Sequence, residues 1–219
     1  MALLIITTKD GSHTIQVSET GDTYHSVHGA VQESNHVFIK AGLKHFISKS
    51  NKTEIKILEV GFGTGLNALL TLNAMSDNSI HVEYTSLEPF PLINDQYSRL
   101  NYADANNKFI ELHTAEWNEL IQITPSFSLH KINSTIQAVK LPDNYFDVVY
   151  FDAFAPNSQP EMWAQDVLMK LKNAMTTDSV LVTYCAKGQV KRDLKSVGFT
   201  IESLPGPPGK REMVRALKF

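Results

Sequence analysis

The stretch "EIKILEVGFGTGLNALLTLNAM" (54–75) decides the fold class. Its first seven residues form an apolar run typical of a buried strand, and apolar residues recur at helical spacing over 65–75. Three glycines at alternate positions lie between the two patterns. A strand, a glycine turn and a helix in this order make up the repeating unit of doubly wound sheets with parallel strands.

The same alternation continues along the chain, and it predicts a mostly parallel, seven-stranded α/β sheet of the Rossmann-like type. Further strands are expected at 80–88, 126–132 with a continuation over 134–141, 145–152, 179–185, 199–204 and 212–219. Helices are expected at 92–103, 107–123, 161–175 and 188–198. Residues 109–114, "FIELHT", also fit a strand, but the wider window favours a helix. The last two strands add one antiparallel strand to the sheet.

Residues 1–50 read as an extension before this pattern. They contain two short strands joined by an Asp-Gly turn, followed by a helix. We expect this extension to pack on a catalytic domain formed by residues 51–219.

Composition excludes several classes of protein and site. The single cysteine, Cys185, rules out an internal disulfide framework and a cysteine-rich zinc site. His25, His28 and His36 have no acid or cysteine at ligand spacing, so no metal site is expected. No apolar run approaches the roughly 18 residues of a membrane span, and no export signal is evident. A cytoplasmic protein that does not enter the membrane is therefore expected.

The glycine loop "GFGTG" predicts a nucleotide cofactor. Glycine lets the backbone turn tightly and approach a ligand at the start of the following helix. A dinucleotide fingerprint would need glycine at position 66, where this chain has Leu66. The spacing G-x-G-x-G after an acid two residues earlier is instead typical of S-adenosylmethionine sites. The expected cofactor residues here are Glu59, Gly61, Phe62, Gly63, Thr64, Gly65 and Asn67.

Two further positions complete the predicted cofactor site. A cofactor with a free ribose diol needs an acid at the end of the second strand, and Glu88 occupies that position. Asn133 and Ser134, after the third strand, are expected near the adenine edge. A different choice of third strand would put Glu116 there instead.

The segment "FDAFAPNSQPEMW" (151–163) follows the strand at 145–152 and is expected beside the cofactor. A carboxylate at Asp152 can orient an amine nucleophile and stabilise the developing ammonium charge. Phe154 can stack on a flat acceptor, and Pro156 stiffens the loop. The structural alternatives are that Asp152 caps a turn and that Phe154 and Trp163 belong to the core. Core packing is favoured for Trp163.

Several segments together resemble the methyltransferase domain of the MnmC family of tRNA-modifying enzymes. They occur in the family's order and spacing and cover nearly the whole chain: "YHSVHGAVQESNHVFI" (24–39), "LEVGFGTGLNALLT" (58–71), "YFDAFAPNSQPEMW" (150–163), "YCAKGQVKRDLKSVGF" (184–199) and "PGPPGKREM" (205–213).

This resemblance implies that S-adenosylmethionine methylates the primary amine of 5-aminomethyl-2-thiouridine at the tRNA wobble position. It also implies that Asp152 and Phe154 lie at the reacting amine and base. Many family members carry an additional FAD-dependent oxidase domain, whereas this chain ends at Phe219. The sequence contains no flavin fingerprint, so no FAD is expected. Either another enzyme supplies the aminomethyl substrate, or the protein works on a product of a different route.

A basic tail suits a polyanionic partner such as tRNA. Residues 181–219 contain eight Lys/Arg against three Asp/Glu, a net charge of +5, which leaves -8 on the rest of the chain. The resemblance makes five of these side chains candidates for phosphate contacts: Lys187, Lys191, Arg192, Lys210 and Arg211. Tyr24 is also a candidate for the substrate side.

Two other functions compete with this interpretation. An aminopropyltransferase of the spermidine synthase type shares the sheet, the glycine loop, the ribose-binding acid and an Asp after the fourth strand. Its polyamine substrate requires an acidic pocket and makes no use of a basic tail. A non-catalytic RNA-binding relative is the second alternative, and the intact glycine loop, Glu88 and Asp152 count against it.

Overall fold

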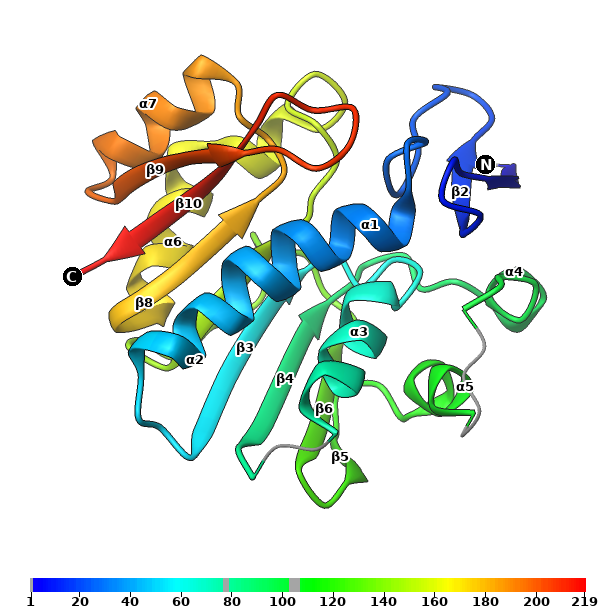
Figure 1. The fold of residues 1–219 in the computed structure, drawn as a ribbon, viewed down its shortest axis with the longest axis horizontal. Helices are drawn as coiled ribbons and strands as arrows, with labels where there is room; N and C mark the ends of the chain where they lie inside the picture. The colour runs from blue at the N-terminus through cyan, green and yellow to red at the C-terminus, as the bar shows by residue number, and fades with distance from the viewer. Residues whose placement is uncertain (1, 77–78, 103–106) are drawn as a thin grey trace.

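The computed structural model describes residues 2–76, 79–102 and 107–219, which form a central sheet covered by helices on both faces (Figure 1). In this part of the chain the sheet has eight strands, in the order β5-β6-β4-β3-β7-β8-β10-β9. The central five strands, from β6 to β8, run parallel to one another, which confirms the predicted mostly parallel α/β fold. The strands are β3 (Glu54–Val60), β4 (His81–Leu87), β5 (Leu120–Thr124), β6 (Phe127–Ile132), β7 (Phe146–Phe151), β8 (Met175–Thr183), β9 (Thr200–Pro205) and β10 (Glu212–Lys218).

Strand β7 shows why its sequence is apolar throughout. Val148 and Tyr150 point into the core on one face of the sheet, and Val149 and Phe151 point into the core on the other. Every residue of β7 is buried. A parallel strand covered on both faces has no solvent side on which polar residues would alternate with apolar ones.

The sheet has eight strands rather than the predicted seven because the helix predicted over 107–123 is wrong in its second half. Only α5 (Lys108–Thr114) is helical, whereas β5 pairs antiparallel with β6 at the sheet edge. Asn118 lies between them with φ of +64°, which a helix interior does not accommodate. The apolar residues that we assigned to a single helical face belong to two elements.

Other predicted boundaries also move. Residues 134–141 do not extend β6 as a strand, and the helix predicted over 161–175 is a 3-10 turn (Pro160–Trp163) followed by α6 (Gln165–Ala174). The helix predicted over 92–103 is reduced to α4 (Asn94–Tyr97), and residue 103 lies outside the described residues. Helix α3 (Leu66–Met75), helix α7 (Gly188–Ser196) and the terminal strand pair are confirmed.

The N-terminal residues form a hairpin and a long helix. Strands β1 (Leu3–Thr7) and β2 (His13–Val17) make a separate two-stranded sheet. Helix α1 (Ala30–Ser34) continues through a π-helical middle part (Asn35–Lys44) into α2 (His45–Lys49), and Figure 1 shows this continuous helix crossing one face of the central sheet.

Gly42 lets this long helix lie close to the sheet. A Cβ atom at Gly42 would be 2.8 Å from Cγ2 of Val182 on β8 and 3.3 Å from Cε1 of Tyr150 on β7. The helix therefore sits where only a residue without a side chain fits without displacement.

We expect Gly42→Leu to destabilise the protein by about 1–3 kcal/mol, the usual cost of overpacking a core. Urea unfolding followed by circular dichroism would measure this change. Lys40→Leu is the matched control, because Lys40 is exposed on the same π-helical segment. Equal stability of the Gly42→Leu and Lys40→Leu variants would contradict the close contact at Gly42.

Candidate functional site

A cavity of about 620 Å³ lies at the carboxyl ends of β3 and β7, the two central strands of the sheet. From β3 the chain continues to β4 and β6 on one side, and it then returns to β7 on the other side. Loops that leave two such strands diverge, and ligands of doubly wound sheets bind in the crevice between them. The glycine loop after β3 and the segment after β7 form facing walls of this cavity.

The two walls touch through their backbones. The N–H of Asp152 donates to the carbonyl oxygen of Val60 at 3.2 Å. Gly61 has φ of +98°, and a Cβ atom there would lie 3.0 Å from the carbonyl oxygen of Asp152. Glycine is required at this position both by its backbone conformation and by the closeness of the opposite wall.

Asp152 is half-buried, and its carboxylate faces the cavity. Oδ2 of Asp152 accepts a hydrogen bond of 2.8 Å from Nδ2 of Asn67 on α3. Burial and the negative charge of Glu33 raise the pKa of Asp152 to about 7, while the Asn67 hydrogen bond and the charge of Lys210 act in the opposite direction. A carboxyl group with a pKa of about 7 changes its charge near neutral pH, as a group that exchanges protons with a ligand must.

Glu88 directly follows β4 and lines a neighbouring wall of the cavity. Its Oε2 accepts the N–H of Gly63 at 2.9 Å, and its Oε1 accepts the N–H of Phe90 at 2.8 Å. Burial raises the pKa of Glu88. These two backbone donors fix the carboxylate at the rim of the glycine loop, where each oxygen has a second lone pair for a ligand hydroxyl.

Residues 22–27 of the N-terminal part also line the cavity. Nε2 of the buried His25 lies 2.7 Å from Oγ1 of Thr64 in the glycine loop. Burial lowers the pKa of His25 to about 4, so this imidazole is neutral at pH 7. The predicted extension therefore contributes directly to the site.

Two aromatic rings form part of the cavity wall. Tyr24 meets Phe154 edge to face, with ring centroids 5.3 Å apart. The backbone of Phe154 is held from behind, because Nε1 of Trp163 donates to its carbonyl oxygen at 2.8 Å. Trp163 is itself buried against Phe151, so its packing in the core also fixes the cavity wall.

Several predicted cofactor residues lie beneath the cavity surface. Glu59 is fully buried and accepts a hydrogen bond of 2.6 Å from Ser86. Burial raises the pKa of Glu59 to about 8, so it is largely protonated at neutral pH. The lining residues do not include Glu59, Thr64, Gly65 or Asn67. These four support the loop and Asp152 from below.

Of the remaining residues considered in the sequence analysis, some line the cavity and others do not. Ser134 lines the cavity, whereas Asn133, Glu116 and Pro156 do not. The side chain of Asn133 instead donates to the carbonyl oxygen of Glu88 at 2.9 Å, and so it supports the chain directly after β4.

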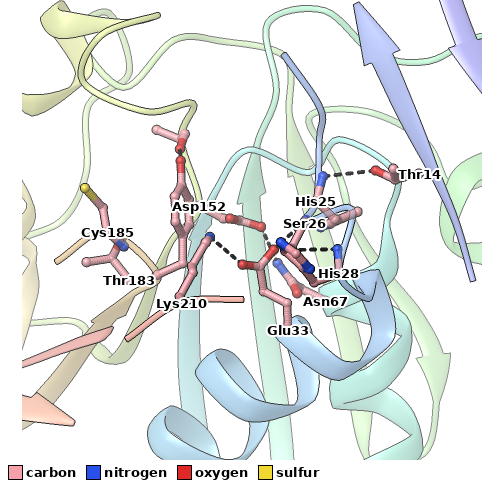
Figure 2. A network of polar contacts seen from close by, with 12 residues as sticks. Thr14, His25, Ser26, His28, Glu33, Asn67, Asp152, Thr183, Cys185 and Lys210 are labelled. Atoms are coloured by element: carbon pink, nitrogen blue, oxygen red, sulfur yellow. Dashed lines mark hydrogen bonds and ion pairs between the residues drawn. The ribbon is translucent and has the colours of Figure 1, made fainter. Parts of the chain in front are cut away.

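The five basic candidates do not lie together. Lys210 lines the cavity, and its Nζ is 2.5 Å from Oε1 of Glu33 (Figure 2). Lys191 forms an ion pair with Glu212 at 2.5 Å on the partly exposed surface. Three more are exposed and outside the cavity lining: Lys187, Arg192 and Arg211.

Glu33 lines the cavity and is 5% exposed, and it was not among the site residues predicted from the sequence. The spacing of Glu33 from apolar residues of the same helix could have indicated that it is buried. Glu33 lies three residues after Ala30 and four before Val37, so it falls on the buried face of the long helix. A carboxylate on a buried helical face requires a partner or a function.

The cavity as a whole is acidic. Its lining includes five acids against a single lysine, Lys210, and the neutral His25. The five acids are Asp22, Glu33, Glu88, Asp152 and Glu161. Such a lining favours a cationic ligand.

The described residues also bear on two other kinds of site, a metal centre and a membrane span. In ranges 2–76, 79–102 and 107–219, no group of three or more His, Cys, Asp or Glu residues could hold a metal ion. Within the same ranges, no helix is long and apolar enough to cross a membrane.

Comparison with known proteins identifies related sequences and folds. A family described as S-adenosyl-L-methionine-dependent methyltransferase matches residues 96–219. The "tRNA 5-methylaminomethyl-2-thiouridine biosynthesis bifunctional protein MnmC" of Leptospira borgpetersenii is 33% identical over 88% of this chain and 32% of its own length. The chain thus spans about a third of the length of such curated relatives.

Solved structures give the same picture of the fold. MnmC2 from Aquifex aeolicus matches with a TM-score of 0.83 and 26% identity, over 99% of this chain and 70% of that one. Spermidine synthase from Thermotoga maritima matches with a TM-score of 0.63 and 12% identity, over 98% of this chain and 67% of that one. At 12% identity, the second match shows a shared fold only.

We expect the carboxyl group of Asp152 to titrate near pH 7 in solution. Glu33→Gln should lower its pKa, because a nearby negative charge is removed, and Asn67→Ala should raise it, because the charged form loses a hydrogen bond. Carbon-13 NMR of the labelled carboxyl group, assigned with Asp152→Asn, would measure these values. Titration near the ordinary value of 3.8 would contradict the buried environment.

Proposed function

Because the chain belongs to the S-adenosyl-L-methionine-dependent methyltransferase family, we propose that it methylates the primary amine of 5-aminomethyl-2-thiouridine at the tRNA wobble position. The observation that carries this proposal is the Asp152 carboxylate in the cavity, directly across from the glycine loop. Similarity to MnmC proteins over most of the chain supports the tRNA substrate. A tRNA substrate also makes the cytoplasm its place of action.

The residues of the cavity fit S-adenosylmethionine. The backbone of Gly61 and Gly63 faces the cavity, and a Cβ atom at either position would come within 3.1 Å of a neighbouring residue. The fixed carboxylate of Glu88 is suited to accept hydrogen bonds from the two ribose hydroxyls. When bound, the cofactor supplies an electrophilic methyl group on a sulfonium.

Asp152 would bind the amine that accepts this methyl group. An alkyl amine arrives mostly as an ammonium ion at pH 7, and it must lose a proton before its nitrogen lone pair can attack. Asn67 holds Oδ2, which leaves Oδ1 to accept an N–H of the substrate. With a pKa of about 7, Asp152 can both orient the amine and accept its proton.

The aromatic side chains would hold the base that carries the amine. The perpendicular rings of Tyr24 and Phe154 offer one face and one edge to a flat heterocycle. Outside the cavity, Lys187, Lys191, Arg192 and Arg211 are candidates to contact tRNA phosphates, which would position the RNA without reading its sequence.

The proposed reaction starts from a primary amine already present on the base. We propose that a separate active site generates it by removing a substituent from the nitrogen. Methylation would then be the later of two steps on the same nucleoside.

An aminopropyltransferase of the spermidine synthase type is the second candidate function. The acidic lining of the cavity favours it, because polyamines are cationic. The similarity to spermidine synthase extends to the fold alone, whereas MnmC relatives are between 27% and 33% identical to this chain over 88% of its length.

We expect purified protein with labelled S-adenosylmethionine to methylate tRNA that contains 5-aminomethyl-2-thiouridine, with a rate that rises as the pH passes through about 7. Asp152→Asn should lower kcat by roughly 10²- to 10⁴-fold and abolish this rise, because the amide cannot accept the proton. The matched control Asp143→Asn changes an exposed aspartate and should have no effect. Transfer to putrescine from decarboxylated S-adenosylmethionine, without any methylation of tRNA, would instead establish the second candidate.

We expect Glu88→Ala to weaken S-adenosylmethionine binding by at least tenfold, because hydrogen bonds to a charged group contribute about 1.5–3 kcal/mol each. Isothermal titration calorimetry would measure the Kd. Glu119→Ala, at an exposed position, is the control. Unchanged affinity of Glu88→Ala would show that the ribose binds elsewhere.

A further inference from the structure

We propose that Glu33 is a second carboxylate of the amine site, which accepts an N–H of the substrate amine from the side opposite Asp152 and is held in place by Lys210. This inference rests on the proposed function. It assigns to the long N-terminal helix a direct part in binding the substrate.

The carboxylate of Glu33 is fixed by contacts on both oxygens. Oε2 accepts the N–H of Ser26 at 2.7 Å, and Oε1 is 2.5 Å from Nζ of Lys210. Figure 2 shows the carboxylates of Glu33 and Asp152 directed into the same space, with Lys210 beside them. Each oxygen of Glu33 retains a lone pair that can accept from a ligand.

Lys210 links Glu33 to the segment that carries Asp152. Its ammonium group lies over the ring of Tyr184, 3.7 Å from the centroid. The hydroxyl group of Tyr184 donates to the carbonyl oxygen of Ala153 at 2.9 Å. The N-terminal helix, the turn before β10 and the loop after β7 are thus joined around one point of the cavity.

When both carboxylates are ionised, the charges at this point do not balance without a ligand. Two carboxylates, Asp152 and Glu33, face one ammonium group, Lys210, and the nearby His25 is neutral. The negative charge of Glu33 is one cause of the raised pKa of Asp152. A substrate ammonium ion bound between the two carboxylates would supply the missing positive charge, since buried charges are stable when paired.

The same arrangement explains why Lys210 differs from the other basic residues of the tail. Its ammonium group is directed at Glu33 inside the cavity, whereas Lys187 and Arg192 are exposed. A lysine that holds a carboxylate for a substrate amine needs no tRNA phosphate as a partner.

The test compares the binding of two tRNAs that differ only in the amine. The affinity of the protein with bound S-adenosylhomocysteine is measured for tRNA with 5-aminomethyl-2-thiouridine and for tRNA with 2-thiouridine. We expect the wild type to prefer the first, and we expect Glu33→Gln to lose at least tenfold of this preference, the size expected for a hydrogen bond between charged groups. If Glu33 had a purely structural role, Glu33→Gln would weaken the binding of both tRNAs equally. The preference would then remain unchanged.

Two further variants make the outcome decisive. Glu33→Gln leaves Lys210 without its partner, so the double variant Glu33→Gln/Lys210→Met, which removes both charges, should fold and show the same loss of preference. Glu119→Gln, which changes an exposed acid outside the cavity lining, should retain the preference.

The outcomes separate the two proposals. If both Glu33 variants retain the preference for the aminomethyl tRNA and Asp152→Asn loses it, the role of Glu33 is overturned. The proposed function then still stands. A wild type that neither prefers nor methylates the aminomethyl tRNA would overturn the proposed function itself.

Discussion

The close approach of the chain after β3 and the chain after β7 is the constraint on which the site depends. The hydrogen bond from Asp152 to Val60, and the space that only a glycine at position 61 leaves, set the distance between the two walls of the cavity. A larger residue at position 61 would push the glycine loop away from Asp152. The glycine loop and the segment after β7 are therefore positioned relative to each other by one backbone contact.

Burial then gives this junction its chemistry. Desolvation keeps His25 neutral, favours the protonated form of Glu59 and brings the pKa of Asp152 to about 7. Residues 22–27 and Glu33 contribute to this burial, because they line the cavity from its N-terminal side. Part of the segment that we interpreted as an extension thus affects the electrostatics of the cavity, since the charge of Glu33 is one cause of the raised pKa of Asp152.

The sequence predicted what depends on local pattern and did not predict what depends on packing between distant segments. The glycine loop, Glu88 and Asp152 follow from strand ends in a doubly wound sheet, and the structure places all three on the cavity. Strand β5 was missed because the periodicity of apolar residues continued across the break at Asn118. The pairing of Glu33 with Lys210 joins residues 177 positions apart, so no local pattern could indicate it.

The central claim is that Asp152 holds the substrate amine in line with the donated methyl group. A crystal structure of the protein with S-adenosylhomocysteine and an anticodon stem-loop carrying 5-aminomethyl-2-thiouridine tests this most directly. We predict the amine nitrogen within hydrogen-bond distance of a carboxylate oxygen of Asp152, with the sulfur of the cofactor product facing its lone pair. An amine nitrogen bound away from Asp152, or a cofactor product bound away from the glycine loop, would contradict the claim.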